Sequence, residues 1–328
     1  GYGCDYVSEA IVQQATAAEG QLAYGPRKYK VLLLIAVESL QPQTAQAIQR
    51  FLEAGGQVVF VGKEPVRAPG WTDHAARDRA VRDTLAAMKQ QHPDRAVLYP
   101  EPKPTEAMLE WFKGLQSRLA VEPYVRFDHP VSTVSQVRYC REDTDVFYIA
   151  NGSLVDSYEL NAEFKLPGRT AWLWDPETGE RFLYPVSGQA NRLRIRLAPT
   201  ESRLIVFDKE KPQGKTLAPL FVSPQAKAIP GPWNVRLEHV DGSIRSLTLE
   251  QLVDFKAARD LKSFAGIIWY ETKVRIEDPR RSRALSLGKV HGVSEVILNG
   301  QNLGTKWYGD HIYDVSATAK AGENILQV

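Results

Sequence analysis

Two continuous apolar runs with a helical stretch between them constrain the fold of this chain most strongly. The runs are residues 30–36 (KVLLLIA) and 57–62 (QVVFVG), and unbroken runs of this kind are typical of parallel strands buried on both faces. Residues 42–54 repeat apolar side chains at helical spacing, with Pro42 suited to the first turn and Gly55 to the stop. The pattern predicts a right-handed βαβ unit.

The rest of this part continues the alternation of helix and strand. Residues 76–90 and 105–117 have helical patterns, residues 96–99 resemble a short strand, and residues 8–19 predict a first helix capped by its serine. No Gly-x-Gly-x-x-Gly or Walker sequence follows the strands, which disfavours a nucleotide site. Over residues 1–117 we therefore predict a small open parallel sheet, flavodoxin-like or glutaminase-like, without catalytic groups.

After residue 117 the hydrophobic period changes to two. Short alternating strands bounded by turn residues predict a small antiparallel β-sandwich over residues 118–210. Residues 211–232 are rich in lysine and proline and are interpreted as a linker. Residues 233–328 contain further strands and a hairpin turn at Asn299-Gly300, the pattern of a jelly roll cut short at its last strand. The predicted fold class is multidomain, α/β followed by all-β.

Composition and charge exclude several classes of protein. Apolar residues make up 43% and charged residues 24%, no run approaches the ~20 apolar residues of a membrane span, and basic residues are scattered at a net charge of +2. We therefore expect neither a membrane nor a nucleic acid as partner. The six histidines lack metal-ligand spacing, so we expect no metal or cofactor. Cys4 and Cys140 either form a disulfide or stay as two free buried thiols, which a chain of this length favours.

Both ends of the chain suggest a fragment. Gly1 opens directly into a structured pattern, and residues 322–328 stop inside a predicted strand. We expect a longer parent protein, whose export signal, if it has one, is removed or lies before Gly1.

Acidic residues near the N-terminus form the first candidate group. Asp5 and Glu9 have the spacing of side chains on one helix face. Two interpretations stay open: one of them reaches an active site beyond Gly1, or they are helix-start carboxylates stabilised by the helix dipole. Glu38 follows the first buried strand, at the edge where open α/β sheets bind ligands.

The second candidate group lies on an expected loop near the C-terminus. Trp307, Tyr308, Asp310 and His311 combine aromatic rings with polar groups, and sugars offer apolar faces and hydroxyls to such a set. The alternative is that Trp307 is a buried anchor between strands. Trp307, Tyr308, Asp310, His311, Asp5 and Glu9 are therefore candidates for lining a substrate, and no residue is predicted to be catalytic.

Short motifs carry a resemblance to two families. The third part resembles the sugar-binding, galactose-binding-like jelly roll of glycoside hydrolase family 2, through residues 268–274 (IWYETKV), 293–304 (VSEVILNGQNLG) and 322–326 (GENIL). The first part resembles the segment after the barrel in glycoside hydrolase family 106, the α-L-rhamnosidases, through residues 5–10, 29–34, 55–59 and 65–70. In the second part, residues 172–179 are similar to a strand-turn that recurs in the same proteins.

The resemblance implies a parent exo-glycosidase that acts on plant or microbial glycans and is secreted or periplasmic in a bacterium. Its catalytic (β/α) barrel, which needs about 250 residues, is expected before Gly1. The expected partners are then carbohydrate, through the parent enzyme, and the missing N-terminal catalytic domain of the same chain. This chain would support and line the active site. Two alternatives stay open: an autonomous carbohydrate-binding module, and an enzyme in which the α/β domain acts by itself.

Overall fold

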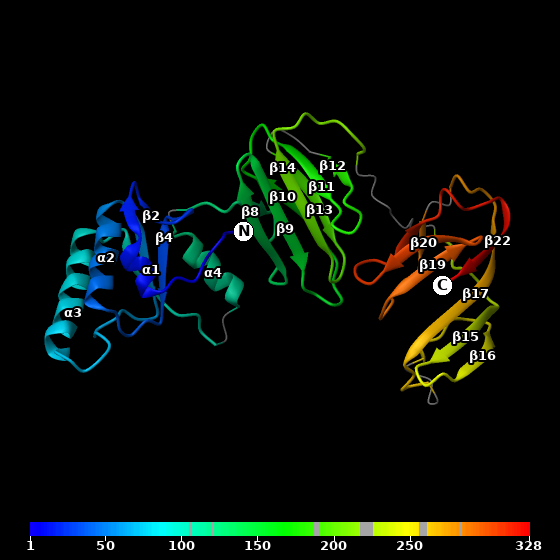
Figure 1. Ribbon diagram of the computed structural model, residues 1–328, viewed down its shortest axis with the longest axis horizontal. Helices are drawn as coiled ribbons and strands as arrows, with labels where there is room; N and C mark the ends of the chain where they lie inside the picture. The colour runs from blue at the N-terminus through cyan, green and yellow to red at the C-terminus, as the bar shows by residue number, and fades with distance from the viewer. Residues whose placement is uncertain (105–106, 120, 186–190, 217–225, 256–260, 282–283) are drawn as a thin grey trace. The chain divides into compact units, whose positions relative to one another are not determined.

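The computed structural model describes residues 1–104, 107–119, 121–185, 191–216, 226–255, 261–281 and 284–328 (Figure 1). It divides into two compact units, Gly1–Arg126 and Phe127–Val328. The finer division of the chain near residues 117, 210 and 232 stays a prediction. Residues 217–225, inside the expected linker, lie outside the described part of the chain.

The first unit contains a parallel sheet between helices. Its elements are α1 (Glu9–Gln14), β1 (Thr16–Ala18), β2 (Gln21–Tyr24), β3 (Arg27–Tyr29), β4 (Val31–Ile35), α2 (Pro42–Glu53), β5 (Gln57–Val61), α3 (His74–Gln91), β6 (Ala96–Tyr99) and α4 (Met108–Gln116). Strands β4, β5 and β6 pair in parallel in that order, with Leu33 opposite Val59 and Val59 opposite Val97. The predicted βαβ unit is confirmed, but only β5 is buried on both faces. β4 is an edge strand, and its Leu33 and Ile35 are 39% and 62% exposed because none of the described strands or helices covers them there.

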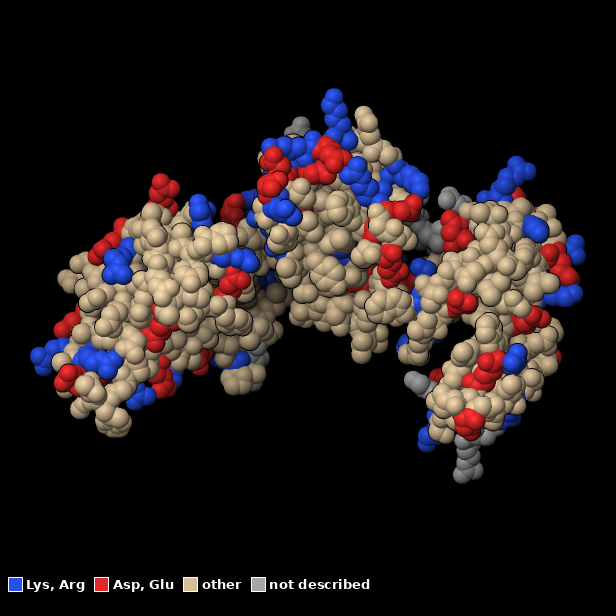
Figure 2. All heavy atoms as spheres, viewed as in Figure 1, with Lys and Arg blue, Asp and Glu red and all other residues tan. Residues whose placement is uncertain are grey.

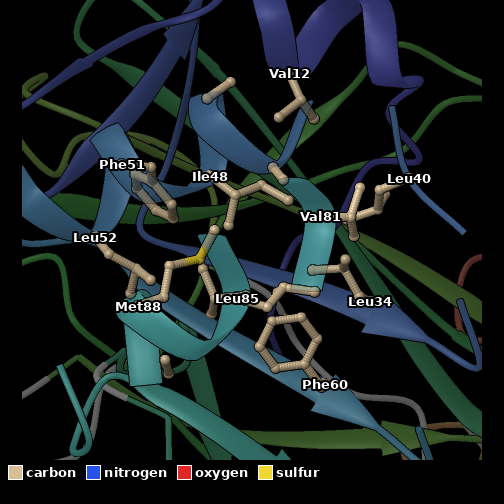
Figure 3. Close-up of a cluster of buried hydrophobic side chains, with 14 of the residues drawn as sticks. Val12, Leu34, Leu40, Ile48, Phe51, Leu52, Phe60, Val81, Leu85 and Met88 are labelled. Atoms are coloured by element: carbon tan, nitrogen blue, oxygen red, sulfur yellow. The ribbon is translucent and has the colours of Figure 1, made fainter. Parts of the chain in front are cut away.

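Helices pack against both faces of this sheet, and β5 is therefore buried along its whole length. On one face, Ile48, Phe51 and Leu52 of α2 and Val81, Leu85 and Met88 of α3 pack with Phe60 (Figure 3). Each such side chain contributes about 1.5–3 kcal/mol through burial. On the other face, Leu115 of α4 packs against Val59 and Val61.

The N-terminal segment differs from the prediction. The helix expected over residues 8–19 begins at Glu9 with Ser8 as its cap, but it ends at Gln14. Strands β1, β2 and β3 then form a separate antiparallel sheet. Glu19 and Gly20 have positive φ angles of 53° and 72°, and this conformation matches the twist of a two-residue hairpin. The tight turn therefore ends the helical pattern early. The last predicted helix, residues 105–117, is observed as α4, and residues 105–106 lie outside the described part.

The second unit is antiparallel throughout its described strands. These are β7 (Val125–Phe127, which begins before the unit boundary), β8 (Val134–Arg141), β9 (Thr144–Asn151), β10 (Tyr158–Phe164), β11 (Thr170–Trp174), β12 (Arg181–Leu183), β13 (Arg192–Leu197), β14 (Ser202–Asp208), β15 (Trp233–His239), β16 (Ile244–Leu249), β17 (Gly266–Ile276), β18 (Ala284–Ser286), β19 (Ser294–Leu298), β20 (Gln301–Lys306), β21 (Ile312–Asp314) and β22 (Gly322–Gln327).

The strands up to β14 form two sheets, with the orders β13-β10-β7 and β12-β11-β14-β9-β8. Phe164 on β10 lies with its ring 4.9 Å from that of Phe147 on β9 and 4.7 Å from that of Phe207 on β14. The two sheets therefore pack face to face around aromatic side chains, as the period-two pattern predicts.

The strands from β15 onward form a six-stranded sheet, β16-β15-β17-β22-β19-β20, and a two-stranded sheet, β18-β21. Tyr313 of β21 belongs to the same buried cluster as Val235, Val296 and Leu326 of the larger sheet. Asn299 and Gly300 form the expected turn between β19 and β20, with φ angles of 52° and 81°.

The two cysteines agree with one part of the expectation. Cys4 and Cys140 are free, as predicted, but both are exposed rather than buried. Cys4 precedes α1, and Cys140 lies near the exposed end of β8 at the edge of its sheet, so neither position has a second layer to cover it.

Charged side chains of both signs are interspersed over the visible face in Figure 2. None of the described helices combines the length and apolarity that crossing a bilayer requires.

Candidate functional site

The candidate loop joins β20 to β21 in the second unit. Trp307 is 65% exposed, so it is not the buried anchor that was the alternative prediction. Its indole Nε1 donates to Glu177 Oε1 at 3.2 Å, and its ring packs edge-on against Tyr308 at 4.8 Å. Glu177 lies in the turn between β11 and β12. The loop therefore presents an indole whose polar edge is fixed and whose ring is open to solvent.

The neighbouring residues hold this loop in place. Asp310 forms an ion pair with Arg196 of β13 at 2.5 Å. Burial, with the adjacent Glu177 carboxylate, raises the pKa of Tyr308, so its hydroxyl stays neutral. Gly309 has a φ of 70° and lies against the side chain of Glu201. The contacts join Trp307, Tyr308 and Asp310 into one surface cluster, which we call the Trp307 cluster.

His311 lies elsewhere. It is 5% exposed, and its Nδ1 lies 2.5 Å from the Ser294 hydroxyl, which in turn lies 2.7 Å from the Tyr313 hydroxyl. Burial, together with the Lys306 ammonium, lowers the pKa of His311. A neutral, buried histidine with a hydroxyl partner contributes to the core of the β18-β21 region. His311 is therefore buried, unlike Trp307, and is not available to line a substrate.

Asp5 and Glu9 do not share a helix face, because α1 begins only at Glu9. Asp5 accepts a hydrogen bond from the Tyr29 hydroxyl at 2.9 Å. Glu9 accepts one from the backbone N–H of Gln41 at 2.8 Å and one from the Thr44 hydroxyl at 2.5 Å. Glu9 therefore caps the N-terminus of α2, where a carboxylate is stabilised by unpaired N–H groups and by the helix dipole.

The carboxyl edge of the parallel sheet has its own ion pairs. Glu38 lies 2.6 Å from Lys63 Nζ and 3.0 Å from Arg67 Nη2. Hydrogen bonding and charge from Lys63, then the charge of Arg67, lower the pKa of this exposed carboxyl. Glu38 is therefore an ionised member of a surface network. Among the described residues, no group of three or more His, Cys, Asp or Glu side chains could hold a metal ion.

One surface was missed by sequence reasoning. Trp269, on β17, is exposed on the outer face of the six-stranded sheet and lines a shallow pocket of about 590 Å³. The available signal was the alternation along residues 267–271, where Ile268 and Tyr270 take the core-facing positions and leave Trp269 outside. The sequence analysis used residues 268–274 only as a family motif, so it did not separate the core-facing from the exposed side chains of this strand.

Comparison with known proteins places the chain in a class. The model of glycoside hydrolase family 106, described as alpha-L-rhamnosidase, matches residues 1–184. That match covers more than half of the 328 residues, so the chain belongs to this family of glycoside hydrolases.

Two relatives show how much of a longer protein the chain represents. The solved structure of a rhamnosidase from Novosphingobium sp. PP1Y matches 98% of this chain and 31% of its own, at 22% identity and a TM-score of 0.68, which shows the shared fold. A curated protein of Formosa agariphila, named as a beta-glucuronidase, is 30% identical over 122 residues, 35% of this chain and 10% of that protein. The chain thus spans about a third of the first and a tenth of the second.

Proposed function

We propose that this chain is a non-catalytic accessory region of a longer α-L-rhamnosidase-like enzyme that acts on plant or microbial glycans. The observation that carries the proposal is the coverage: nearly the whole chain fits the fold of a rhamnosidase, yet it accounts for 31% of that structure. Family membership supports a glycan-processing parent.

The sheet content supports a catalytic domain elsewhere. A (β/α) barrel has eight parallel strands and about 250 residues, whereas the described residues of this chain contain one parallel sheet of three strands. We assign residues 1–117 to a flavodoxin-like or glutaminase-like domain and residues 118–210 to a β-sandwich. Residues 211–232 are then a linker and residues 233–328 a galactose-binding-like jelly roll. The partner is a catalytic domain N-terminal to Gly1, in a secreted or periplasmic bacterial protein.

The Trp307 cluster is the part of the chain proposed to line the substrate path. Its open indole could stack on the apolar face of a sugar, and the Glu177 bond holds the ring in one orientation. Asp310 is engaged by Arg196, which fixes the loop that carries the indole. Asp5 and Glu9 are hydrogen-bonded to residues of the first unit, and in this proposal they stabilise that unit and do not contact the substrate.

Kinetics of Trp307→Ala in the longer parent enzyme test this role. Stacking on a sugar contributes on the order of 1 kcal/mol, so we expect KM to rise about tenfold or less while kcat is kept. The melting temperature should stay nearly unchanged, since Trp307 is exposed and removing it opens no core cavity. Tyr139→Ala, an exposed aromatic on β8, is the matched control. A large fall in melting temperature with unchanged kinetics would make Trp307 structural and refute the role.

The second candidate function is an autonomous carbohydrate-binding module. The pocket beside Trp269 favours it, because that pocket lies wholly on one sheet of this chain. It differs from the first in requiring that the chain bind sugar without its catalytic domain.

A further inference from the structure

The outer face of the six-stranded sheet combines one exposed indole with a ring of polar side chains. Strand alternation sends Val235, Leu237 and Tyr270 into the core, and it leaves Trp269 and Arg236 on the opposite face. Trp269 is 39% exposed, enough to offer part of its ring to a ligand.

The strand register sets the layout of this face. Trp269 lies opposite Arg236, which lies opposite Ser246 on β16. In the next row, Glu271 has Asn234 on one side and Gln327 of β22 on the other. Thr248 completes that row beside Asn234. Side chains on one face of paired strands are neighbours at about 5 Å, so these residues surround the indole.

Several of these polar groups keep hydrogen-bonding capacity. Glu271 accepts from Gln327 Nε2 at 2.8 Å, which orients the carboxylate, and Arg236 pairs with Glu238 at 2.7 Å. Among the described residues, the side chains of Asn234, Ser246 and Thr248 have no hydrogen-bond partner. Donors and acceptors therefore line the pocket beside an apolar ring.

We propose that the pocket around Trp269 binds a neutral pyranose unit of a glycan chain. The indole would stack against the C–H face of the sugar, because the negative face of an aromatic ring attracts such weakly positive groups. Asn234, Thr248 and Glu271 would hydrogen-bond its hydroxyls. The pocket, of about 590 Å³, is open and shallow, so it would contact one face of the sugar ring and not enclose it.

The charges of the face favour a neutral ligand. Arg236, the one cation among the described residues that line the pocket, is paired with Glu238, and the Glu271 carboxylate is bound by a neutral amide, so the lining offers no unpaired cation to an acidic sugar. Exposed isoleucines also lie further along this face, namely Ile267 on β17, Ile244 on β16 and Ile325 on β22. The inference rests on the proposed function only for the class of ligand, a glycan, and it requires neither the Trp307 cluster nor catalysis.

Affinity electrophoresis of the 328-residue chain tests the inference. Gels are cast with soluble neutral polysaccharides (galactan, xylan, glucomannan) or with an acidic one (polygalacturonate), and the mobility of the chain is measured in each. We expect at least one neutral gel to retard it, and Trp269→Ala to weaken binding by up to about tenfold. Trp269→Tyr should keep part of the retardation, because a ring remains.

Two exposed aromatic residues outside both proposed sugar contacts provide matched controls. Trp71, 89% exposed in the first unit, and Tyr139, 61% exposed on β8, should each tolerate alanine without loss of retardation. Thermal unfolding of Trp269→Ala checks that the fold is kept. Mobility unchanged in every neutral gel would overturn the inference, and so would retardation that survives Trp269→Ala undiminished. Absence of rhamnoside hydrolysis leaves this result unaffected, so the two proposals fail separately.

Discussion

Glu9 accepts hydrogen bonds from the Gln41 backbone N–H and the Thr44 hydroxyl, at the N-terminus of α2. Gln41 makes no side-chain capping bond of its own, so α1 supplies the cap that α2 lacks. His311 also has a structural partner, because its Nδ1 is hydrogen-bonded to the Ser294 hydroxyl and its side chain is buried. At the residue scale, the acidic and imidazole candidates have structural partners, and the open aromatic rings are the groups free to meet a ligand.

Replacing Glu9 tests the capping role. Glu9→Ala should lower the free energy of unfolding by about 0.5–2 kcal/mol, the usual cost of a lost helix cap. Urea denaturation measures the change. Glu53→Ala, an exposed carboxylate at the other end of α2, should shift stability by no more than about 0.5 kcal/mol. Equal effects from the two substitutions would contradict the capping role.

The stability of the fold should depend on pH through the phenol of Tyr184. Burial raises the pKa of its phenol to about 12, and its hydroxyl donates to the Arg194 carbonyl at 2.9 Å. In the unfolded chain this phenol ionises near its ordinary pKa of 10.0, so its contribution to the stability of the fold is fully present below pH 10 and is lost as pH rises toward about 12. Tyr184→Phe should flatten the fall in melting temperature over that window. An identical fall in the two proteins would refute the assignment.

At the scale of elements, the prediction was accurate where a pattern was long and unambiguous. The apolar runs of β4 and β5 and the apolar stripe of α2 indicated the βαβ unit correctly, although Leu33 and Ile35 of the edge strand β4 are exposed. The β1-β2-β3 sheet was missed because its strands have three or four residues, and the alanines in β1 also suit a helix. Short elements depend on the turns between them more than on their own pattern.

The candidate site was predicted less completely, for a physical reason. Alternation along β17 indicates which residues share a face, but it does not show which face is covered. Trp269 and Trp172 both occupy strand positions, yet Trp172 is 1% exposed, with Asp208 bonded to its indole and Arg181 over its ring. What packs above a strand is decided by segments distant in sequence, so exposure of an aromatic needs the fold.

Limited proteolysis tests the proposed boundary between elements β14 and β15. Lys215 is held by an ion pair with Glu180, and its carbonyl accepts from Leu183 N, while Lys227 is exposed and lies outside any strand. Mild trypsin should therefore cut at Lys227 before Lys215. Mass spectrometry of the first fragments identifies the site. A first cut within residues 31–61 would show that the domain division is misplaced.

At the scale of the whole molecule, the chain belongs to a glycoside hydrolase family but spans only part of the length of a related rhamnosidase. The family model covers residues 1–184, and the fold shared with a rhamnosidase covers nearly the whole chain but a minor share of that protein. In the proposed function, the chain contributes scaffold and contact surface to a chemical step that residues outside it perform. Two carboxylates considered as candidates, Glu9 and Glu38, are engaged in a helix cap and in ion pairs.

Hydrolysis of an aryl α-L-rhamnoside by the purified 328-residue chain tests this claim most directly. The account predicts release of the aryl alcohol at the rate of buffer alone, across neutral and mildly acidic pH and with or without added calcium. Enzymes typically turn over at about 1–1,000 per second, so activity within a few orders of magnitude of that range would be easily seen. Such turnover, retained after repeated purification, would contradict the non-catalytic assignment.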